Sequence, residues 1–191
     1  WHEQELNNFS LTLQFKLDDP KQNSGVFIRF PDPGDDPWVA VKQGYEIQIA
    51  GNEVANNQTG SVYEIQAPIA NPVKIGEWNN YQIISANEKI AIILNGELIN
   101  IFVTEKGRGD MKGYIGIQNH DEGSPVQFRN IAVDSFGKGG TLMETLGRAS
   151  ITRSQLTNYW SKASPIARPD MPTRKSGVTK GKPDWYRIAD H

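Results

Sequence analysis

The side chains best suited to chemistry in this sequence lie in short segments rich in isoleucine and valine. Glu46 and Gln48 alternate with isoleucines, and Gln118 and His120 stand at the end of a second run of the same kind. Because side chains of a strand point alternately to its two faces, isoleucines that are turned inward leave these polar residues on the outer face. The same reasoning predicts one polar face, whose members are Arg29, Glu46, Gln48, Gln118 and His120, with Tyr63 at its edge.

These residue types suit the recognition of a sugar. Amides, a carboxylate and an arginine can satisfy several hydroxyl groups, and an aromatic ring can pack against a pyranose. The alternative is a solvated sheet face whose polar side chains pair with one another. His120 is the only internal histidine, since His2 and His191 lie at the chain ends.

Elements that could position these residues follow from the hydrophobic pattern. Apolar or alternating runs recur at short intervals with turn residues between them, and no helical pattern intervenes in this part of the chain. Asn95-Gly96 is a hairpin signal, because both central residues of a type I′ turn need positive φ. The pattern predicts an all-β antiparallel sandwich or jelly roll, with strands over residues 9–17, 26–30, 45–49, 62–65, 78–85, 89–94, 98–101, 113–118 and 126–133.

Charge divides the 191 residues into two parts. Residues 1–136 carry 10 basic and 18 acidic side chains, whereas residues 137–191 carry 10 basic and 4 acidic ones, and the total net charge is −2. A balance so close to neutral argues against a nucleic-acid-binding protein. The absence of cysteine excludes disulfides, thiolate metal sites and a cysteine nucleophile. No apolar run approaches the roughly 20 residues of a membrane-spanning helix.

The basic part reads as a C-terminal extension of a domain that spans residues 1–136. Thr152 and Gln155 can form a capping box, so a short helix is expected over residues 152–162. Beyond it, prolines predict an extended segment without a core of its own. Near its end the extension carries the aromatic and apolar residues Trp185, Tyr186 and Ile188. They predict that residues 141–191 dock, either onto the acidic body or onto a protein partner.

A series of short motifs resembles one known family. Seven of them occur in the family's order and together cover about residues 7–136: NSGVFIR (23–29), GYEIQI (44–49), TGSVY (59–63), GEWN (76–79), NG (95–96), GYIGIQNH (113–120) and FRNI (128–131). They are similar to the 3-keto-disaccharide hydrolase family, a concanavalin-like jelly roll of glycoside-hydrolase-like type. The family normally has strands before the segment that opens this chain. We therefore expect a processed or excised piece, or a domain completed by something else.

The resemblance implies a secreted or periplasmic domain that acts on or binds oxidised sugars. In 3-keto-glycosides the ketone acidifies the C2 proton and permits elimination. Such chemistry needs a base near C2, an acid near the leaving oxygen and stabilisation of an enediolate. On this sequence Glu46 and His120 would supply the base and the acid, in either assignment, with a divalent metal as a candidate cofactor. Oxygen atoms of the substrate would be bound by Arg29, Gln48 and Gln118, beside Tyr63.

Three hypotheses therefore stand side by side. The first is an enzyme that cleaves 3-keto-glycosides. The second is a carbohydrate-binding module that uses the same face without turnover. The third is a structural or docking subunit that works through its basic extension; it is favoured by Ala50, which stands where the family commonly has an aspartate.

Overall fold

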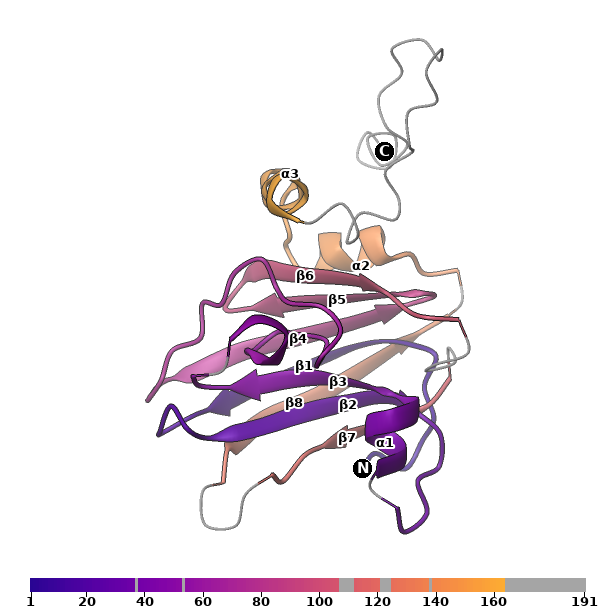
Figure 1. The fold of residues 1–191 in the computed structure, drawn as a ribbon. Helices are drawn as coiled ribbons and strands as arrows, with labels where there is room; N and C mark the ends of the chain where they lie inside the picture. Colours follow the sequence, from indigo (N-terminus) through magenta and orange to yellow (C-terminus); the bar gives the residue numbers. More distant parts are fainter. Residues whose placement is uncertain (37, 53, 107–111, 121–124, 138, 164–191) are drawn as a thin grey trace.

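A computed structural model describes residues 1–36, 38–52, 54–106, 112–120, 125–137 and 139–163 (Figure 1). The strands of this part form a five-stranded sheet in the order β6-β5-β4-β1-β8 and a three-stranded sheet in the order β3-β2-β7. Neighbouring strands are antiparallel, which confirms the predicted all-β sandwich. The strands are β1 (Asn8–Lys16), β2 (Asn23–Phe30), β3 (Tyr45–Ala50), β4 (Trp78–Ala86), β5 (Lys89–Leu94), β6 (Glu97–Val103), β7 (Tyr114–Ile117) and β8 (Gln127–Phe136).

Alternation of apolar side chains builds the core between the two sheets. In β1, Phe9, Leu11, Leu13 and Phe15 are buried, and this strand pairs with β4 so that Leu11 faces Ile83. Tyr81 of β4 crosses the sandwich and donates its hydroxyl proton to the backbone oxygen of Gln48 at 3.1 Å. The predicted hairpin at Asn95-Gly96 is confirmed, since these two residues have φ of +51° and +81°.

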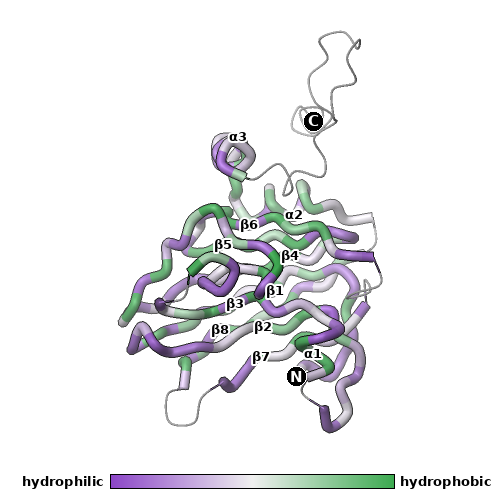
Figure 2. Tube along the Cα trace, viewed as in Figure 1, coloured by the Kyte–Doolittle hydropathy of each residue, from purple (hydrophilic) through white to green (hydrophobic). Residues whose placement is uncertain are grey.

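Two short helices cover part of the outer face of the five-stranded sheet. They are α2 (Leu142–Arg148) and α3 (Arg153–Lys162), and they pack a second apolar cluster against β4, β5 and β6 (Figures 1 and 2). The hydroxyl of Tyr159 accepts a hydrogen bond from the Ile101 backbone N–H at 2.8 Å and donates to the Ile101 oxygen at 3.2 Å. The predicted helix with its Thr152–Gln155 capping box is confirmed.

Two details of the predicted fold are wrong. Residues 62–65 form turns, and Val62 makes isolated bridges only, with Ile47 and Gln66. The helix α1 (Trp38–Gln43) intervenes between β2 and β3, where the sequence predicted none. Asp36 caps the start of this helix: its side-chain Oδ1 accepts a hydrogen bond from the Trp38 backbone N–H at 2.9 Å, and its backbone oxygen accepts one from the Val39 N–H at 3.2 Å. Acidic and polar residues commonly play this part at helix starts.

The end of the chain was predicted to dock through Trp185, Tyr186 and Ile188, and these residues lie outside the described part. No helix of the described residues is both long and apolar enough to cross a membrane.

Candidate functional site on the three-stranded sheet

The outer face of the three-stranded sheet gathers polar residues from both of its outer strands. Glu46 and Gln48 lie on β3, where they face Phe27 and Gly25 of the central strand β2. On the other side of β2, Gln118 directly follows β7 and donates its backbone N–H to the Gly25 oxygen at 2.9 Å. The antiparallel register therefore brings residues separated by about seventy positions in the sequence around one glycine of the central strand.

The carboxyl group of Glu46 is packed against that glycine. A methyl group at Gly25 would lie 2.4 Å from Oε1 of Glu46, so only glycine leaves room for the carboxyl in this position. The Glu46 side chain is 7% exposed, and this burial raises its pKa to about 7. In the orientation that satisfies its neighbours, the Gln48 amide donates to Oε1 of Glu46 at 3.2 Å and to the Ser24 oxygen at 3.0 Å.

Two further groups tune the same carboxyl. After burial, the charge of His120 is the next largest influence and lowers the pKa of Glu46, while the carboxylate of Glu64 raises it. His120 is exposed at the end of the segment that follows β7. Tyr63 is half-buried and donates its backbone N–H to the backbone carbonyl oxygen of Glu46 at 2.9 Å. The structure thus places Glu46, Gln48, Tyr63, Gln118 and His120 in one region, as the alternation predicted.

Arg29 does not lie on this face, and the prediction that put it beside Glu46 is wrong. A β-bulge interrupts the pairing of β2 with β7 between Ile28 and Phe30, and Arg29 adopts a positive φ of +56°. Its side chain is turned toward the opposite sheet, where Nε donates to Ser85 Oγ at 2.8 Å and Nη2 donates to the Asn87 oxygen. Burial lowers the pKa of Arg29 to about 10. The guanidinium therefore ties the two sheets together inside the sandwich.

A hollow of about 430 Å³ adjoins the polar residues. Its walls include Phe27 and Phe30 of β2, Trp1 at the chain start, and Gln118. The helix α1 closes one side by packing Ala40 against the two phenylalanines. The hollow combines aromatic side chains with two amides, of Gln118 and Asn119, and the carboxylate of Asp35; a mainly apolar wall with a few polar groups is typical of sites for sugar rings and other amphipathic ligands.

Sequence reasoning assigned no role to three residues of this region. Phe30 shares the outer side with Phe27 only because the bulge at Arg29 shifts the alternation by one residue, and the sequence carries no signal of that bulge. Gly25 could have been found, because a glycine inside a strand often marks a close approach of another group. Phe27 was correctly placed outward by the alternation.

A metal ion was the cofactor suggested by the family resemblance. Across the described ranges of the chain, no three His, Asp or Glu side chains are grouped as a metal site requires. Glu46 and His120 supply two donors at most. These residues do not fit a metal centre, and we assign them no step that passes through a metal ion.

Comparison with known proteins agrees with the geometry. The model of the 3-keto-alpha-glucoside-1,2-lyase-like domain matches residues 1–134. The chain belongs to this family. The match confirms the resemblance seen in the seven motifs, and the five polar residues gathered on the three-stranded sheet all lie inside it. A search of curated proteins found no match.

Solved structures share the fold of this 3-keto-alpha-glucoside-1,2-lyase-like domain. A protein named "putative glycosyl hydrolase" from Parabacteroides distasonis is 29% identical, with a TM-score of 0.61 over 71% of this chain and 82% of its own. A second one from the same organism is 20% identical, with a TM-score of 0.60 over 71% and 75% of the two chains. The carbohydrate-binding module CBM66 from Bacillus subtilis is 14% identical, with a TM-score of 0.52 over 70% and 78%. The chain is thus a sugar-related jelly-roll domain of the glycosyl hydrolase-like or carbohydrate-binding type.

Proposed function

We propose that the outer face of the three-stranded sheet binds a 3-keto-glycoside and that Glu46 removes its C2 proton. The observation that supports this most strongly is the buried carboxyl against Gly25, with a pKa of about 7. A general base is most effective when its pKa lies near the working pH. Ordinary surface carboxylates, with pKa values of about 4, hold their proton too weakly for this task.

The elimination needs no oxidant and no second substrate. Glu46 takes the proton from C2, which the neighbouring ketone makes acidic, and an enediolate forms. The electron pair then forms the C1–C2 double bond while the C1–O glycosidic bond breaks. The departing oxygen takes a proton from His120, and the products are an alcohol and an unsaturated 3-keto sugar. Addition of water to the double bond completes a net hydrolysis.

Other residues of the site would position the substrate. The Gln118 amide lines the hollow, and Gln48 holds the Glu46 carboxyl through its amide nitrogen. Trp1, which is 67% exposed, offers the aromatic surface against which a sugar ring packs, while Phe27 and Phe30 are buried in the same wall. Within this proposal, Gln118 binds hydroxyl or keto oxygens and Gln48 keeps the base in place. An extracytoplasmic location, which the family resemblance implies, forms part of the same proposal.

Incubation of the protein with a 3-keto-disaccharide tests this function. We expect release of the monosaccharide, together with ultraviolet absorption of the conjugated ketone if the unsaturated product accumulates. Glu46→Gln should abolish release and His120→Ala should slow it, by factors of about 100 to 10,000 for a lost acid or base. Glu64→Gln is the matched control when release is measured above about pH 8, where Glu46 is ionised with or without the Glu64 charge, because it removes a nearby exposed carboxylate and leaves Glu46 in place. Unchanged release after both Glu46→Gln and His120→Ala would refute the assigned roles.

A carbohydrate-binding function without turnover is the second candidate, and Ala50 favours it. Ala50 lies on the same side of β3 as Glu46 and Gln48, at the position where the family commonly has an aspartate. Its backbone N–H and oxygen are both engaged by Thr59 Oγ1, at 2.8 Å and 2.7 Å. Position 50 therefore contributes no carboxylate beside Glu46. Calorimetry that shows binding of a 3-keto-disaccharide with no released monosaccharide would decide for this candidate.

A further inference from the structure

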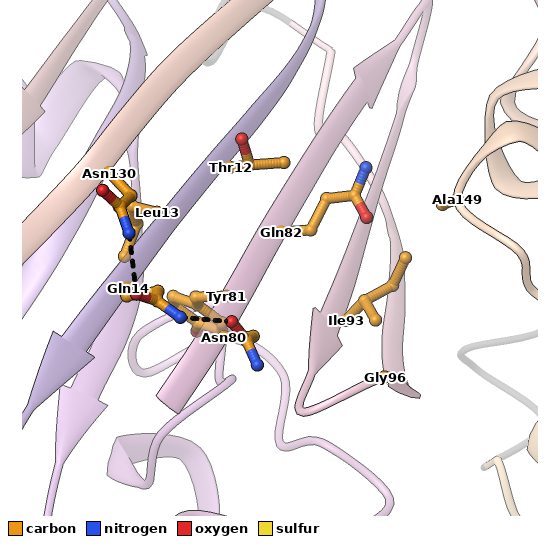
Figure 3. Close-up of a pocket in the computed structure, with 10 residues that line it drawn as sticks. All are labelled: Thr12, Leu13, Gln14, Asn80, Tyr81, Gln82, Ile93, Gly96, Asn130 and Ala149. Carbon is orange, nitrogen blue, oxygen red and sulfur yellow. Dashed lines mark hydrogen bonds between the residues drawn. The ribbon is translucent and has the colours of Figure 1, made fainter. Parts of the chain in front are cut away.

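The opposite side of the sandwich carries a groove that the family does not explain. It has a volume of about 440 Å³ and lies on the outer face of the five-stranded sheet, next to the chain segment that joins α2 to α3. Its floor consists of the outward side chains of β1 and β4, and Ile93 and Ala149 stand on the side of the helices (Figure 3). The polar side chains that line it are Thr12, Gln14, Asn80, Gln82 and Asn130.

Several of these amides are held in place by one another. Gln14 donates to Asn80 Oδ1 at 2.7 Å and accepts from Asn130 Nδ2 at 2.9 Å, as the dashed lines in Figure 3 show. Arg129 also donates to the Gln14 oxygen, at 2.8 Å. Gln82 is fixed separately through its amide nitrogen, which donates to Ser10 Oγ at 2.8 Å. A ligand would therefore meet side chains whose conformations are already set, which lowers the entropic cost of binding.

The same network leaves hydrogen-bonding groups open toward the groove. Within the described part of the chain, the Thr12 hydroxyl, the amide nitrogen of Asn80 and the amide oxygen of Gln82 have no hydrogen-bond partner among protein groups. The groove thus offers both donors and acceptors. Asn80 and Gln82 share one face of β4, which extends about 3.3 Å per residue, so these groups are spaced along the groove.

Among the residues that the structure describes, no charged side chain lines this groove. The guanidinium of Arg129 is not among the lining groups; it is bonded to Gln14 and lies 3.9 Å from the centre of the Trp78 ring. Anions and cations would have no partner of opposite charge on these walls. Uncharged donors and acceptors beside an apolar wall instead match a polyhydroxylated ligand, in which hydroxyl groups alternate with C–H faces.

We propose that this groove is a second binding site, for a neutral glycan chain. It lies on the other sheet of the sandwich from Glu46, so it would hold a polysaccharide while the Glu46 face is free to act on a separate sugar. The proposal does not depend on the function of that face. Simultaneous use of both faces would raise the effective concentration of substrate near Glu46.

Affinity electrophoresis in gels that contain soluble starch, dextran, hydroxyethyl cellulose or a soluble β-1,3-glucan tests the proposal. At least one of these neutral polysaccharides should retard the protein, and polygalacturonate, which is charged, should not. The double variant Asn80→Ala with Gln82→Ala should weaken retardation about tenfold, as expected when two hydrogen bonds are lost. Thr12→Trp, which fills the groove and keeps both amides, should weaken it as well.

Two control variants separate this site from others. Asn158→Ala removes an exposed amide on α3, outside the groove, and should leave retardation unchanged. Glu46→Gln should also leave it unchanged. The proposal is overturned if no neutral polysaccharide of the four retards the protein, or if retardation survives both groove variants with their thermal unfolding unaltered. Loss of retardation in Glu46→Gln would equally overturn it, since the glycan would then be bound by the other face.

Discussion

Replacement of Glu46 by glutamine should change how the stability of the protein depends on pH. Below about pH 4.5 the carboxyl is neutral in both the folded and the unfolded chain. Between this pH and about pH 7, the folded chain keeps a proton that the unfolded chain releases, because burial raises the pKa of Glu46 from 4.5 to about 7. Stability therefore falls as pH rises through this window. At 1.36 kcal/mol per pKa unit, the loss amounts to about 3 kcal/mol.

Glutamine is neutral at every pH, so the variant lacks this loss. We expect the free energy of unfolding of Glu46→Gln, relative to the wild type, to rise by up to about 3 kcal/mol between about pH 4 and pH 8. Urea unfolding at a series of pH values measures this difference. Glu64→Gln, which alters an exposed carboxylate, should show a much smaller change. A difference between Glu46→Gln and wild type that stays constant with pH would refute the claim that this carboxyl is perturbed.

Three further predictions use the same structure. Gly25→Ala places a methyl group 2.4 Å from Oε1 of Glu46; displacement of the carboxyl should lower the rate of 3-keto-disaccharide cleavage by about 100-fold with circular dichroism unchanged. Glu64→Gln removes a charge that raises the pKa of Glu46, so the midpoint of the pH–rate profile should move to lower pH. Tyr159→Phe removes two hydrogen bonds to Ile101 and should lower the free energy of unfolding by about 1–3 kcal/mol, measured in urea; an equal stability would show that α3 docks without them.

Alternation of side chains was sufficient to predict the sandwich and most of the candidate face. It placed Glu46 and Gln48 on the outer side because Ile47 and Ile49 beside them are buried in the core. It placed Gln118 outward on the expectation that Ile115 and Ile117 are both buried; Ile115 is, whereas Ile117 is 41% exposed. The alternation failed at Arg29, where a bulge adds one residue to β2 and turns Phe30 to the opposite face. A bulge of this kind is set by how β2 pairs with β7, which is a contact between distant parts of the chain.

The helices show a different limit of sequence reasoning. Thr152 and Gln155 revealed α3, and Thr141 and Glu144 form the same capping box at the start of α2. The signal for α2 is weaker, because this helix has only seven residues and lies directly after a glycine-rich segment. That both helices would cover β4–β6 could not be read from the sequence, since it depends on an apolar patch that the strands form only when paired.

The most direct test of the central claim tracks the C2 proton during turnover in heavy water. A 3-keto-disaccharide is incubated with the protein, and the released 3-keto sugar is examined by nuclear magnetic resonance. A control sample without protein shows how long the C2 proton survives spontaneous exchange, and the product is examined within that time. If Glu46 removes the C2 proton and heavy water later adds to the double bond, the product carries deuterium at C2. The Glu46→Gln variant should release no such deuterated product. A product released at the wild-type rate with hydrogen retained at C2 would mean direct glycosidic hydrolysis and would contradict the proposed mechanism.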